Sequence, residues 1–344
     1  MQQFSIAVVI LNWNGKRHLQ QFLPSVVENT RDAEVWLADN GSTDESVAFV
    51  HEHFPSVKII ELGSNLGFAG GYNKALSMLN HEYFVLLNSD VEVSPHWVEP
   101  VLRLLQRDTS IAAAQPLVLD FSRKTHFEHA GAAGGYLDRD AYPFCAGRIF
   151  NTFEENKGQY SKNHEVFWAS GAALFVRASA YYECGGLDPD FFAHMEEIDL
   201  CWRMKGLGYK VFACGDSKVY HLGGGTLNKE NPRKTFLNFR NNLYLILKND
   251  FRPWFLLRFL RRLLLDGIAG GRFLLEGKPS FFLAVLRAHF SFYGNLSKTY
   301  AKRLSNRKLL RNPNPAGLFR KSILSSYFLK KQQKFSDLNP SDFF

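Results

Sequence analysis

Three carboxylates within four positions form the most informative segment of the sequence. Glu196, Glu197 and Asp199 follow a pair of phenylalanines and open an amphipathic stretch. Clustered carboxylates raise one another's pKa, and aromatic neighbours exclude water, which is how a carboxylate becomes a general base at neutral pH. We therefore expect one of these acids to take a proton from a substrate hydroxyl. The alternative is structural, with Asp199 and Arg203 paired one helical turn apart and the acids complementing a helix dipole.

A further acidic position follows the apolar run 83–87. Asp90 stands there with Asn88 and Glu92 as neighbours. A hard divalent cation such as Mg2+ is usually held by one or two carboxylates and by phosphate oxygens of a substrate, and Asp90 meets that need. His221 is a candidate additional ligand, because imidazole binds metals and the glycines at 223–225 imply close backbone approach. A lone histidine is otherwise more often structural.

Polar turns follow four apolar runs in the first 90 residues. They are Asn12-Trp13-Asn14-Gly15, Asp39-Asn40-Gly41-Ser42-Thr43-Asp44, Asn65-Leu66-Gly67-Phe68-Ala69-Gly70-Gly71-Tyr72-Asn73 and Asn88-Ser89-Asp90. Each alone is an ordinary turn or helix cap. Together they suit a nucleotide, because Asp39 can accept a hydrogen bond from a pyrimidine imide and the glycine-rich loop opens a helix that favours a diphosphate. This loop is neither a dinucleotide fingerprint nor a P-loop.

Alternating strand and helix patterns must position these turns. We expect strands at 6–11, 35–38, 57–62, 83–87 and 111–119, and helices at 17–29, 44–53, 71–79 and 96–107, with Ser42 or Asp44 capping the second helix. Repeated strand–helix units predict an α/β fold with a mainly parallel, Rossmann-like sheet flanked by helices. Ligands of such sheets bind beyond the carboxyl ends of the strands, where the polar turns lie. Residues 120–165 are expected to form loops or short strands.

The end of the chain differs in charge and pattern from the rest. Residues 251–344 carry 18 Lys and Arg against 4 Asp and Glu, a net charge of +14, so residues 1–250 carry −6 of the chain total of +8. Residues 254–265 mix Leu, Phe and Trp with Arg, which is typical of an amphipathic helix at an anionic membrane surface. The alternative is a helix packed on the α/β domain with its arginines in water.

Composition argues against several other classes. The four cysteines form no Cys-x-x-Cys pair, which argues against a zinc site. Met1 leads straight into a strand pattern, so we expect no signal peptide, and no run of about 18 uncharged apolar residues predicts a transmembrane helix. We expect a cytoplasmic protein with free thiols. No nucleic-acid-recognition motif accompanies the basic charge, so we expect no nucleic-acid partner.

Taken together, the motifs resemble those of the family 2 glycosyltransferases with the GT-A fold, and most closely the bacterial rhamnosyltransferase-like branch. The resemblance covers about residues 4–250. It is carried by the four turns and by Gly171-Ala172, Gly185-Gly186-Leu187-Asp188, Glu196-Glu197-Ile198-Asp199-Leu200-Cys201-Trp202-Arg203 and His221-Leu222-Gly223-Gly224. It implies a GT-A catalytic domain at 1–250 and a basic, amphipathic helical tail at 251–344.

The resemblance also implies roles for individual residues. Asp39 would bind the uracil or thymine ring, and Asp90 would bind Mg2+ or Mn2+, with His221 near the metal or the leaving diphosphate. Glu197 is the favoured base, with Glu196 and Asp199 as alternatives. The nucleotide-sugar would further contact Asn12, Asn14, Gly15, Ser42, Asn65, Gly67, Gly70, Asn73, Asn88, Arg203 and Arg240. Asn88 stands where the family's metal motif usually has an aspartate.

The implied activity is inverting transfer of a sugar from a UDP- or dTDP-sugar to a glycan or lipid-linked acceptor in cell-surface polysaccharide synthesis. Such an enzyme would be cytoplasmic and peripheral on the inner face of the cell membrane. The alternatives are a nucleotidyltransferase, which would normally have a basic glycine-rich loop after the first strand, and a non-catalytic nucleotide-sugar-binding module.

Overall fold

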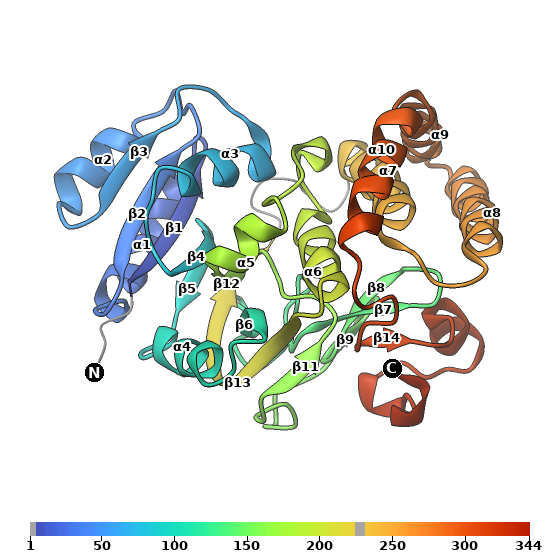
Figure 1. Cartoon of the computed structure of the whole chain (residues 1–344). Helices are drawn as coiled ribbons and strands as arrows, with labels where there is room; N and C mark the ends of the chain where they lie inside the picture. Colours follow the sequence, from blue (N-terminus) through green and yellow to red (C-terminus); the bar gives the residue numbers. More distant parts are fainter. Residues whose placement is uncertain (1–4, 224–230) are drawn as a thin grey trace.

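A computed structural model describes residues 5–223 and 231–344, and its centre is a nine-stranded sheet (Figure 1). The strand order is β11-β13-β6-β12-β4-β1-β2-β3, with β5 added beside β13. The strands are β1 Ile6–Asn12, β2 Glu34–Asp39, β3 Lys58–Glu61, β4 Tyr83–Asn88, β5 Val91–Val93, β6 Ile111–Asp120, β11 His164–Val166, β12 Ala173–Arg177 and β13 Lys210–His221. Strands β1 to β4 are parallel, and β12 runs antiparallel to β4 and β6.

Helices cover both faces of this sheet. They are α1 Lys16–Asn29, α2 Ser46–His53, α3 Gly67–Leu76, α4 Val98–Arg107, α5 Ala178–Glu183 and α6 Glu196–Gly206. Successive residues of β1 belong to two different hydrophobic cores: Ala7 and Val9 to one, Val8 and Ile10 to the other. A strand buried on both faces is apolar throughout, which is why 6–11 reads as a continuous hydrophobic run. The predicted α/β fold with a mainly parallel sheet flanked by helices is confirmed.

Three predicted helix starts are wrong: α4 begins at Val98 rather than at residue 96, and the other two errors share a cause. The second helix, α2, begins at Ser46 rather than at Asp44, and Asp44 Oδ1 instead accepts from the Ser46 amide at 3.1 Å. The helix expected from Gly71 begins four residues earlier, at Gly67, so the glycine-rich segment lies inside α3 rather than before it. Both errors arise because the turn residues are stabilised by side chains of other turns, which a local pattern does not show.

A second, smaller sheet is built from the region expected to hold loops or short strands. Its order is β10-β9-β8-β7-β14. The strands are β7 Gly135–Asp138, β8 Pro143–Cys145, β9 Arg148–Ile149, β10 Thr152–Phe153 and β14 Leu318–Phe319. β14 pairs parallel with β7, although it comes from the end of the chain. The tail is therefore not helical throughout, because the segment after residue 309 returns to the body of the protein.

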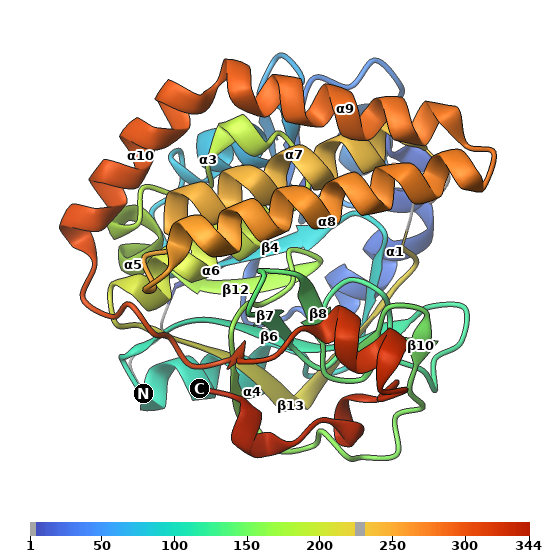
Figure 2. The ribbon, with the colours of Figure 1, turned by 90° about the vertical axis from the view of Figure 1, so that its right-hand side faces the viewer.

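Four longer helices form a layer at one side of the molecule (Figures 1 and 2). They are α7 Pro232–Asn249, α8 Phe255–Leu275, α9 Pro279–Gly294 and α10 Leu296–Leu309, followed by short helical turns at Ser325–Leu329, Phe335–Asp337 and Pro340–Asp342. Phe292 of α9 and Phe319 of β14 belong to the same hydrophobic core as the central sheet. Among the helices of the described ranges, none combines the length and apolarity needed to cross a bilayer.

Candidate active site

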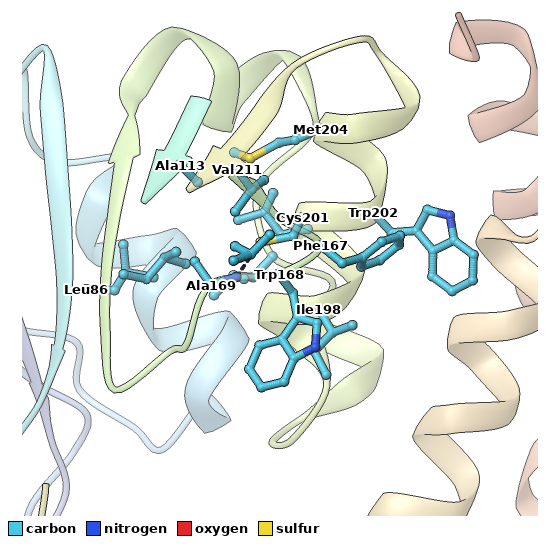
Figure 3. Packing of buried hydrophobic residues seen from close by; sticks show 14 of the residues in the cluster. Leu86, Ala113, Phe167, Trp168, Ala169, Ile198, Cys201, Trp202, Met204 and Val211 are labelled. Carbon is cyan, nitrogen blue, oxygen red and sulfur yellow. Dashed lines mark hydrogen bonds between the residues drawn. The ribbon is translucent and has the colours of Figure 1, made fainter. Parts of the chain in front are cut away.

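Helix α6 carries the clustered acids at its first turn, and its apolar side anchors it to the sheet. Cys201 and Met204 of α6 are fully buried in the core that also contains Phe167 and Val211 (Figure 3). The Ala169 amide donates to Cys201 Sγ at 3.5 Å, the contact dashed in Figure 3. This packing fixes the first turn of α6 relative to the sheet.

Residues 191–197, which lead into α6 and include its first two residues, are called the acid loop below. Phe192, His194 and Met195 have φ of +63°, +70° and +75°. Non-glycine residues with positive φ are uncommon and cost free energy, so the surrounding structure must hold them in place. Such strain is concentrated at functional sites in proteins.

Helix α7 supplies the groups that hold the acid loop. The side-chain amide of Asn241 donates to the carbonyl oxygens of Phe191, Ala193 and His194 at 3.0, 2.8 and 2.7 Å. The Arg240 guanidinium donates to the Phe191 carbonyl at 3.1 Å and also lies over the ring of Tyr244. Arg240 thus has a partner in the loop, and its expected contact with the nucleotide-sugar stays a prediction.

Two glutamates at the start of α6 keep a carboxylate oxygen without a partner. Among the described residues, Oε2 of Glu196 and Oε2 of Glu197 are buried and accept no hydrogen bond. Burial raises the pKa of Glu197 to about 7. Burial, together with the charge of Glu197, holds the pKa of Glu196 well above its usual value. Glu196 is buried and Glu197 is partly exposed, so Glu197 is the acid that a ligand can reach.

Asp199 has a different environment and is better explained as a structural residue. Its Oδ2 accepts from Arg203 Nε at 2.9 Å, and its Oδ1 accepts from Lys248 Nζ and Asn249 Nδ2, both at 2.8 Å. Burial raises the pKa of Asp199, but Arg203 and Lys248 outweigh it and hold the pKa below its usual value. Arg203 also donates to the Gly186 carbonyl at 2.8 Å. These contacts favour a structural role for Asp199 and Arg203, and the catalytic role of the one and the nucleotide contact of the other stay predictions.

Asp90 and His221 come together in a second part of the site. His221 Nε2 lies 3.2 Å from Asp90 Oδ1, and its Nδ1 lies 3.3 Å from Glu128 Oε2. Asn88 Nδ2 is 3.5 Å from the same Nε2. Burial lowers the pKa of His221, but the two carboxylates outweigh it and raise the pKa to about 10. The pairing of β13 with β5 places His221 beside Val91 and so creates this contact.

These residues fit a divalent cation that is also bound by a ligand. The described part of the chain contains no group of three or more His, Cys, Asp or Glu that could hold a metal alone. A nucleotide-bound cation needs only one or two protein ligands, because phosphates and water supply the others. The 3.2 Å between Asp90 Oδ1 and His221 Nε2 suits neighbouring ligands of one cation with bonds of about 2.0–2.2 Å. Glu128 would then orient the imidazole from behind.

One of the glycines after His221 is explained by a contact within the protein. Gly223 has φ of +66°, and a Cβ there would lie 2.6 Å from Glu128 Oε1. Glycine at 223 therefore makes room for the carboxylate behind His221. Gly224 and Gly225 lie outside the described residues.

The turns after β1 and β2 form one hydrogen-bonded unit. Asn12 Nδ2 donates to Asp39 Oδ1 at 3.1 Å and to Ser42 Oγ at 3.0 Å, while Asp39 Oδ2 accepts from the Ser42 amide at 2.9 Å. Ser42 Oγ also accepts from the Asn14 amide at 2.9 Å, so Ser42 does not cap α2. Asn12 Oδ1 is buried and has no partner within the described ranges. A Cβ at Gly15 would lie 2.4 Å from that oxygen, so only glycine fits there.

The loop at the start of α3 is held by contacts within the protein. Asn65 Oδ1 accepts from the Gly67 amide at 2.9 Å, and the Phe68 amide donates to the Phe192 carbonyl at 2.9 Å. Gly67 has φ of +72°, and a Cβ there would lie 2.7 Å from the Phe192 ring. The Gly67 and Phe68 amides thus have partners, and glycine at 67 is explained by the close approach of Phe192; a contact of this loop with a nucleotide-sugar stays a prediction.

The other two residues expected at this loop also have local contacts. A Cβ at Gly70 would meet Leu66 Cβ at 3.1 Å. Asn73 donates to the Leu187 carbonyl at 2.7 Å and accepts from the Tyr181 hydroxyl at 2.6 Å. The Asn73 amide thus joins α3 to the segment after α5, and its contact with a nucleotide-sugar stays a prediction.

The separate parts converge on one edge of the sheet. In the strand register Asn12 is paired with Asp39, and Leu11 is paired with Asn88. The Asn88 amide donates to the Ala172 carbonyl at 3.0 Å. A Cβ on the preceding residue, Gly171, would lie 3.8 Å from Glu197 Cβ. The Asp39 turn, the Asp90–His221 pair and the acid loop therefore share the carboxyl edge of β1, β2 and β4.

Comparison with known proteins identifies the family. A sequence model described as glycosyl transferase family 2 matches residues 7–184, more than half of the chain. The chain belongs to glycosyl transferase family 2. This glycosyltransferase is 24% identical over 264 residues to N-acetylglucosaminyl-diphospho-decaprenol L-rhamnosyltransferase of Mycobacterium tuberculosis, an alignment that covers 72% of this chain and 86% of the relative. It is 21% identical over 244 residues to the low-salt glycan biosynthesis hexosyltransferase Agl10 of Haloferax volcanii, covering 69% and 73%.

Solved structures agree on the fold of this glycosyltransferase. GalNAc-T7, in a structure with UDP, GalNAc and Mn2+, superposes with a TM-score of 0.58 at 15% identity and covers 96% of this chain and 57% of that one. Residues 1–349 of TarS from S. aureus superpose with a TM-score of 0.51 at 15% identity, covering 96% and 93%. The GT-A fold is confirmed.

Sequence reasoning missed two groups that complete the site of this glycosyltransferase. Glu128, behind His221, lies in the irregular region 120–165, where no local pattern marks it. Asn241 and Lys248 lie on α7 and contact the acid loop and Asp199. Asn241 and Lys248 lie among several other polar residues of α7, so no local signal marked them.

Proposed function

We propose that this glycosyltransferase moves a sugar from a UDP- or dTDP-sugar to a hydroxyl group of a glycan or lipid-linked acceptor, with inversion at the anomeric carbon and with Glu197 as the base. The observation that carries the proposal is Oε2 of Glu197, which has no hydrogen-bond partner among the described residues and lies near the sheet edge shared with Asp39 and Asp90. A non-catalytic binding module would have no use for a strained loop that presents this group.

The proposed reaction is a single displacement. The acceptor oxygen attacks the anomeric carbon, a new carbon–oxygen bond forms, and the bond to the diphosphate oxygen breaks on the opposite face. Glu197 takes the proton of the acceptor hydroxyl, and the nucleoside diphosphate leaves with the bonding electrons. A pKa of about 7 suits this task, because the carboxylate is ionised near neutral pH and remains basic enough to accept a proton.

Asp90 and His221 are the proposed protein ligands of Mg2+ or Mn2+. When bound, such a cation would offset negative charge on the leaving diphosphate. Two similar folds support this assignment, since the structures of GalNAc-T7 and of the mannosyltransferase PcManGT, TM-score 0.50 at 14% identity, are described with Mn2+. Asn88, in place of an acid, contributes no charge to the pair.

Asp39 and its hydrogen-bonded turn are the proposed base-recognition element. Asp39 is held at both oxygens by Asn12 and Ser42, so its position is fixed before a ligand arrives. A carboxylate accepts a hydrogen bond from the imide N–H of uracil or thymine. The buried, unpartnered Asn12 Oδ1 offers a second acceptor beside it.

The acceptor and the pathway are proposed from the relatives. The Mycobacterium tuberculosis relative is named for a diphospho-decaprenol acceptor, and a Myxococcus xanthus relative, 24% identical over 213 residues, is named an O-antigen biosynthesis protein. We place this enzyme in cell-surface polysaccharide synthesis, at the inner face of the cell membrane. The catalytic domain is proposed to span residues 1–250, which contain every candidate site residue.

Replacement of Glu197 by Gln tests the function. The variant Glu197→Gln keeps the size of the side chain but cannot accept the proton, so transfer should fall by at least about a hundredfold while binding of UDP or dTDP is unchanged. The control is Glu52→Gln, an exposed acid on α2, which should transfer as the wild type does. Unchanged turnover in Glu197→Gln would remove Glu197 as the base. A wild type that binds nucleotide-sugars but turns none over would support a binding module instead.

A further inference from the structure

Helix α8 places Phe255, Phe259 and Leu263 against the core, but it also buries charged residues and exposes a row of leucines. Its buried side contains Arg262 and Asp266, with Nε and Oδ1 2.8 Å apart, and His289 of α9 lies 3.3 Å from the same carboxylate. Its outward side contains Leu257 and Leu264, each 66% exposed. Water favours the reverse arrangement, with leucines inside and charges outside.

The outward leucines of α8 form a continuous stripe. Leu257, Leu260, Leu264 and Ile268 are exposed and follow one another at steps of three or four residues. Residues at this spacing lie on one side of a helix. A stripe of this length differs from the single exposed apolar residues that are normal on soluble proteins.

Helix α9 extends the apolar surface. It packs beside α8, and Phe282 of α9 lies against Gly270 of α8 (Figure 2). Leu286, Phe290 and Tyr293 are exposed at the same spacing, while Ala288 between them is buried. The outward stripes of α8 and α9 together are called the apolar face below.

Basic side chains border the apolar face. Arg287 of α9 is exposed and has no ion-pair partner among the described residues, and Lys278 stands exposed at the turn between the two helices. Arg272 near the end of α8 is also exposed, and it shares the exposed Glu276 with Lys278 as an ion-pair partner. Long basic side chains beside an apolar stripe can reach the headgroups of anionic lipids while the apolar residues enter the acyl region.

We propose that the apolar face docks on the surface of an anionic lipid bilayer. Charge favours lipid over a second copy of the chain, because the segment 251–344 carries +14 and two copies would bring like charges together. None of the described helices can cross a bilayer, so the face lies in the interface plane. This proposal stands on α8 and α9 alone and does not depend on the proposed transfer reaction.

The helical layer that carries the apolar face also contacts the site. Lys302 of α10 contacts Asp190 at 2.7 Å, just before the acid loop, and α7, which holds that loop, packs against α9 and α10. The apolar face and the acid loop are therefore linked through one layer of helices.

Flotation of the full chain with vesicles tests the proposal. Vesicles of phosphatidylcholine with phosphatidylglycerol should carry the protein upward at low salt, and phosphatidylcholine alone should carry much less. The variant Leu264→Asp/Phe290→Asp should reduce the bound fraction by about tenfold or more, because each substitution puts a charge into the acyl region. The control Met78→Asp/Leu329→Asp adds the same charge at equally exposed positions, 61% and 78% against 66% and 73%, and should bind as wild type.

The tryptophan at the start of α8 gives a second readout. Trp254 is 81% exposed, so transfer into a bilayer should shift its fluorescence to shorter wavelength, and Trp254→Phe should abolish that shift. The proposal is overturned if the wild type stays unbound with phosphatidylglycerol vesicles at low salt, or if Leu264→Asp/Phe290→Asp binds as well as the control. A wild type that self-associates through this face, measured by sedimentation, and ignores vesicles also overturns it.

Discussion

His221 lies with its Nε2 3.2 Å from the Oδ1 of Asp90, a contact made between β13 and the turn before β5. Glu128 lies behind the imidazole at 3.3 Å from Nδ1. A histidine between two carboxylates resembles a metal ligand with its outer-shell partner. The strand pairing that creates this arrangement joins distant parts of the chain, so the contact is a property of the fold and not of a local motif.

The outer carboxylate is expected to tune metal binding. Replacement of Glu128 by Gln should weaken Mn2+ affinity in the presence of UDP or dTDP by about 10- to 100-fold, because the imidazole loses the charge that orients it. Titration calorimetry or Mn2+ electron paramagnetic resonance measures this without any turnover. The matched variant is Glu155→Gln, an exposed acid from the same region, with wild-type affinity expected. Equal Mn2+ affinity in Glu128→Gln and Glu155→Gln would show that Glu128 does not contribute to metal binding.

The transfer rate should depend on pH through Glu197. Its pKa is raised to about 7, so the base is increasingly protonated below that pH and the rate should fall. A profile of kcat between about pH 5 and pH 9 checks this, with an apparent pKa near 7 in the enzyme–substrate complex expected. A rate that is constant across this interval, with chemistry shown to be rate-limiting, would contradict the assignment.

The free energy of unfolding should fall as the pH rises through 7, whereas the transfer rate should rise. A carboxyl group whose pKa is raised from 4.5 to about 7 on folding contributes stability that is full below pH 4.5 and is lost as the pH rises through 7. Glu197→Gln, which stays neutral, should therefore stabilise the protein by about 1–3 kcal/mol at pH 8 and by little at pH 5. Thermal unfolding at the two pH values measures the difference. An equal gain in stability at pH 5 and at pH 8 would show that folding does not raise the pKa of Glu197.

Asn241 should act as a positioning residue for the acid loop. The isosteric variant Asn241→Asp cannot donate to the three loop carbonyls, so we expect a loss of about 1–3 kcal/mol of stability and a fall in kcat larger than the change in donor KM. Asn29→Asp removes a side-chain hydrogen bond near the end of α1 and should leave kcat unchanged. A wild-type kcat in folded Asn241→Asp would argue against this role.

Asp199 should matter for stability rather than for proton transfer. Asp199→Asn leaves Arg203 and Lys248 without their shared carboxylate in the interior, and we expect a cost of about 3–5 kcal/mol in unfolding free energy. The exposed change Asp216→Asn should cost less than about 0.5 kcal/mol. Below its melting temperature, Asp199→Asn should keep most of its turnover, unlike Glu197→Gln. A stable but inactive Asp199→Asn would restore Asp199 as a candidate base.

The sequence was sufficient to predict the fold and the shared edge of the sheet. The apolar runs 6–11 and 83–87 are buried on both faces and give an unambiguous strand pattern, and the polar residues after them lie at the predicted edge. The acidic cluster could also be recognised, because three carboxylates within four positions follow aromatic residues, and such neighbours raise the pKa of a carboxyl group. These features are local, so a single sequence contains them.

What the sequence could not show depends on contacts between distant segments. Nothing near Asn73 reveals that Tyr181 and Leu187 occupy its amide, and nothing near Asp199 reveals Lys248. The return of β14 to β7 was likewise invisible, because a two-residue strand has no periodicity. The partners of Asn73 and Asp199 within the protein therefore favour a structural role for both side chains, which the sequence alone could not indicate.

The most direct test of the account is a crystal structure with Mn2+ and UDP or dTDP, with the metal located by its anomalous signal. We predict that the Mn2+ lies within bonding distance of Asp90 and His221 and that the base of the nucleotide contacts Asp39. The Glu197 carboxylate should lie on the side of the sugar-binding space opposite the diphosphate, where the acceptor hydroxyl would enter. A metal bound away from Asp90, or a nucleotide on the opposite edge of the sheet from Glu197, would contradict the account.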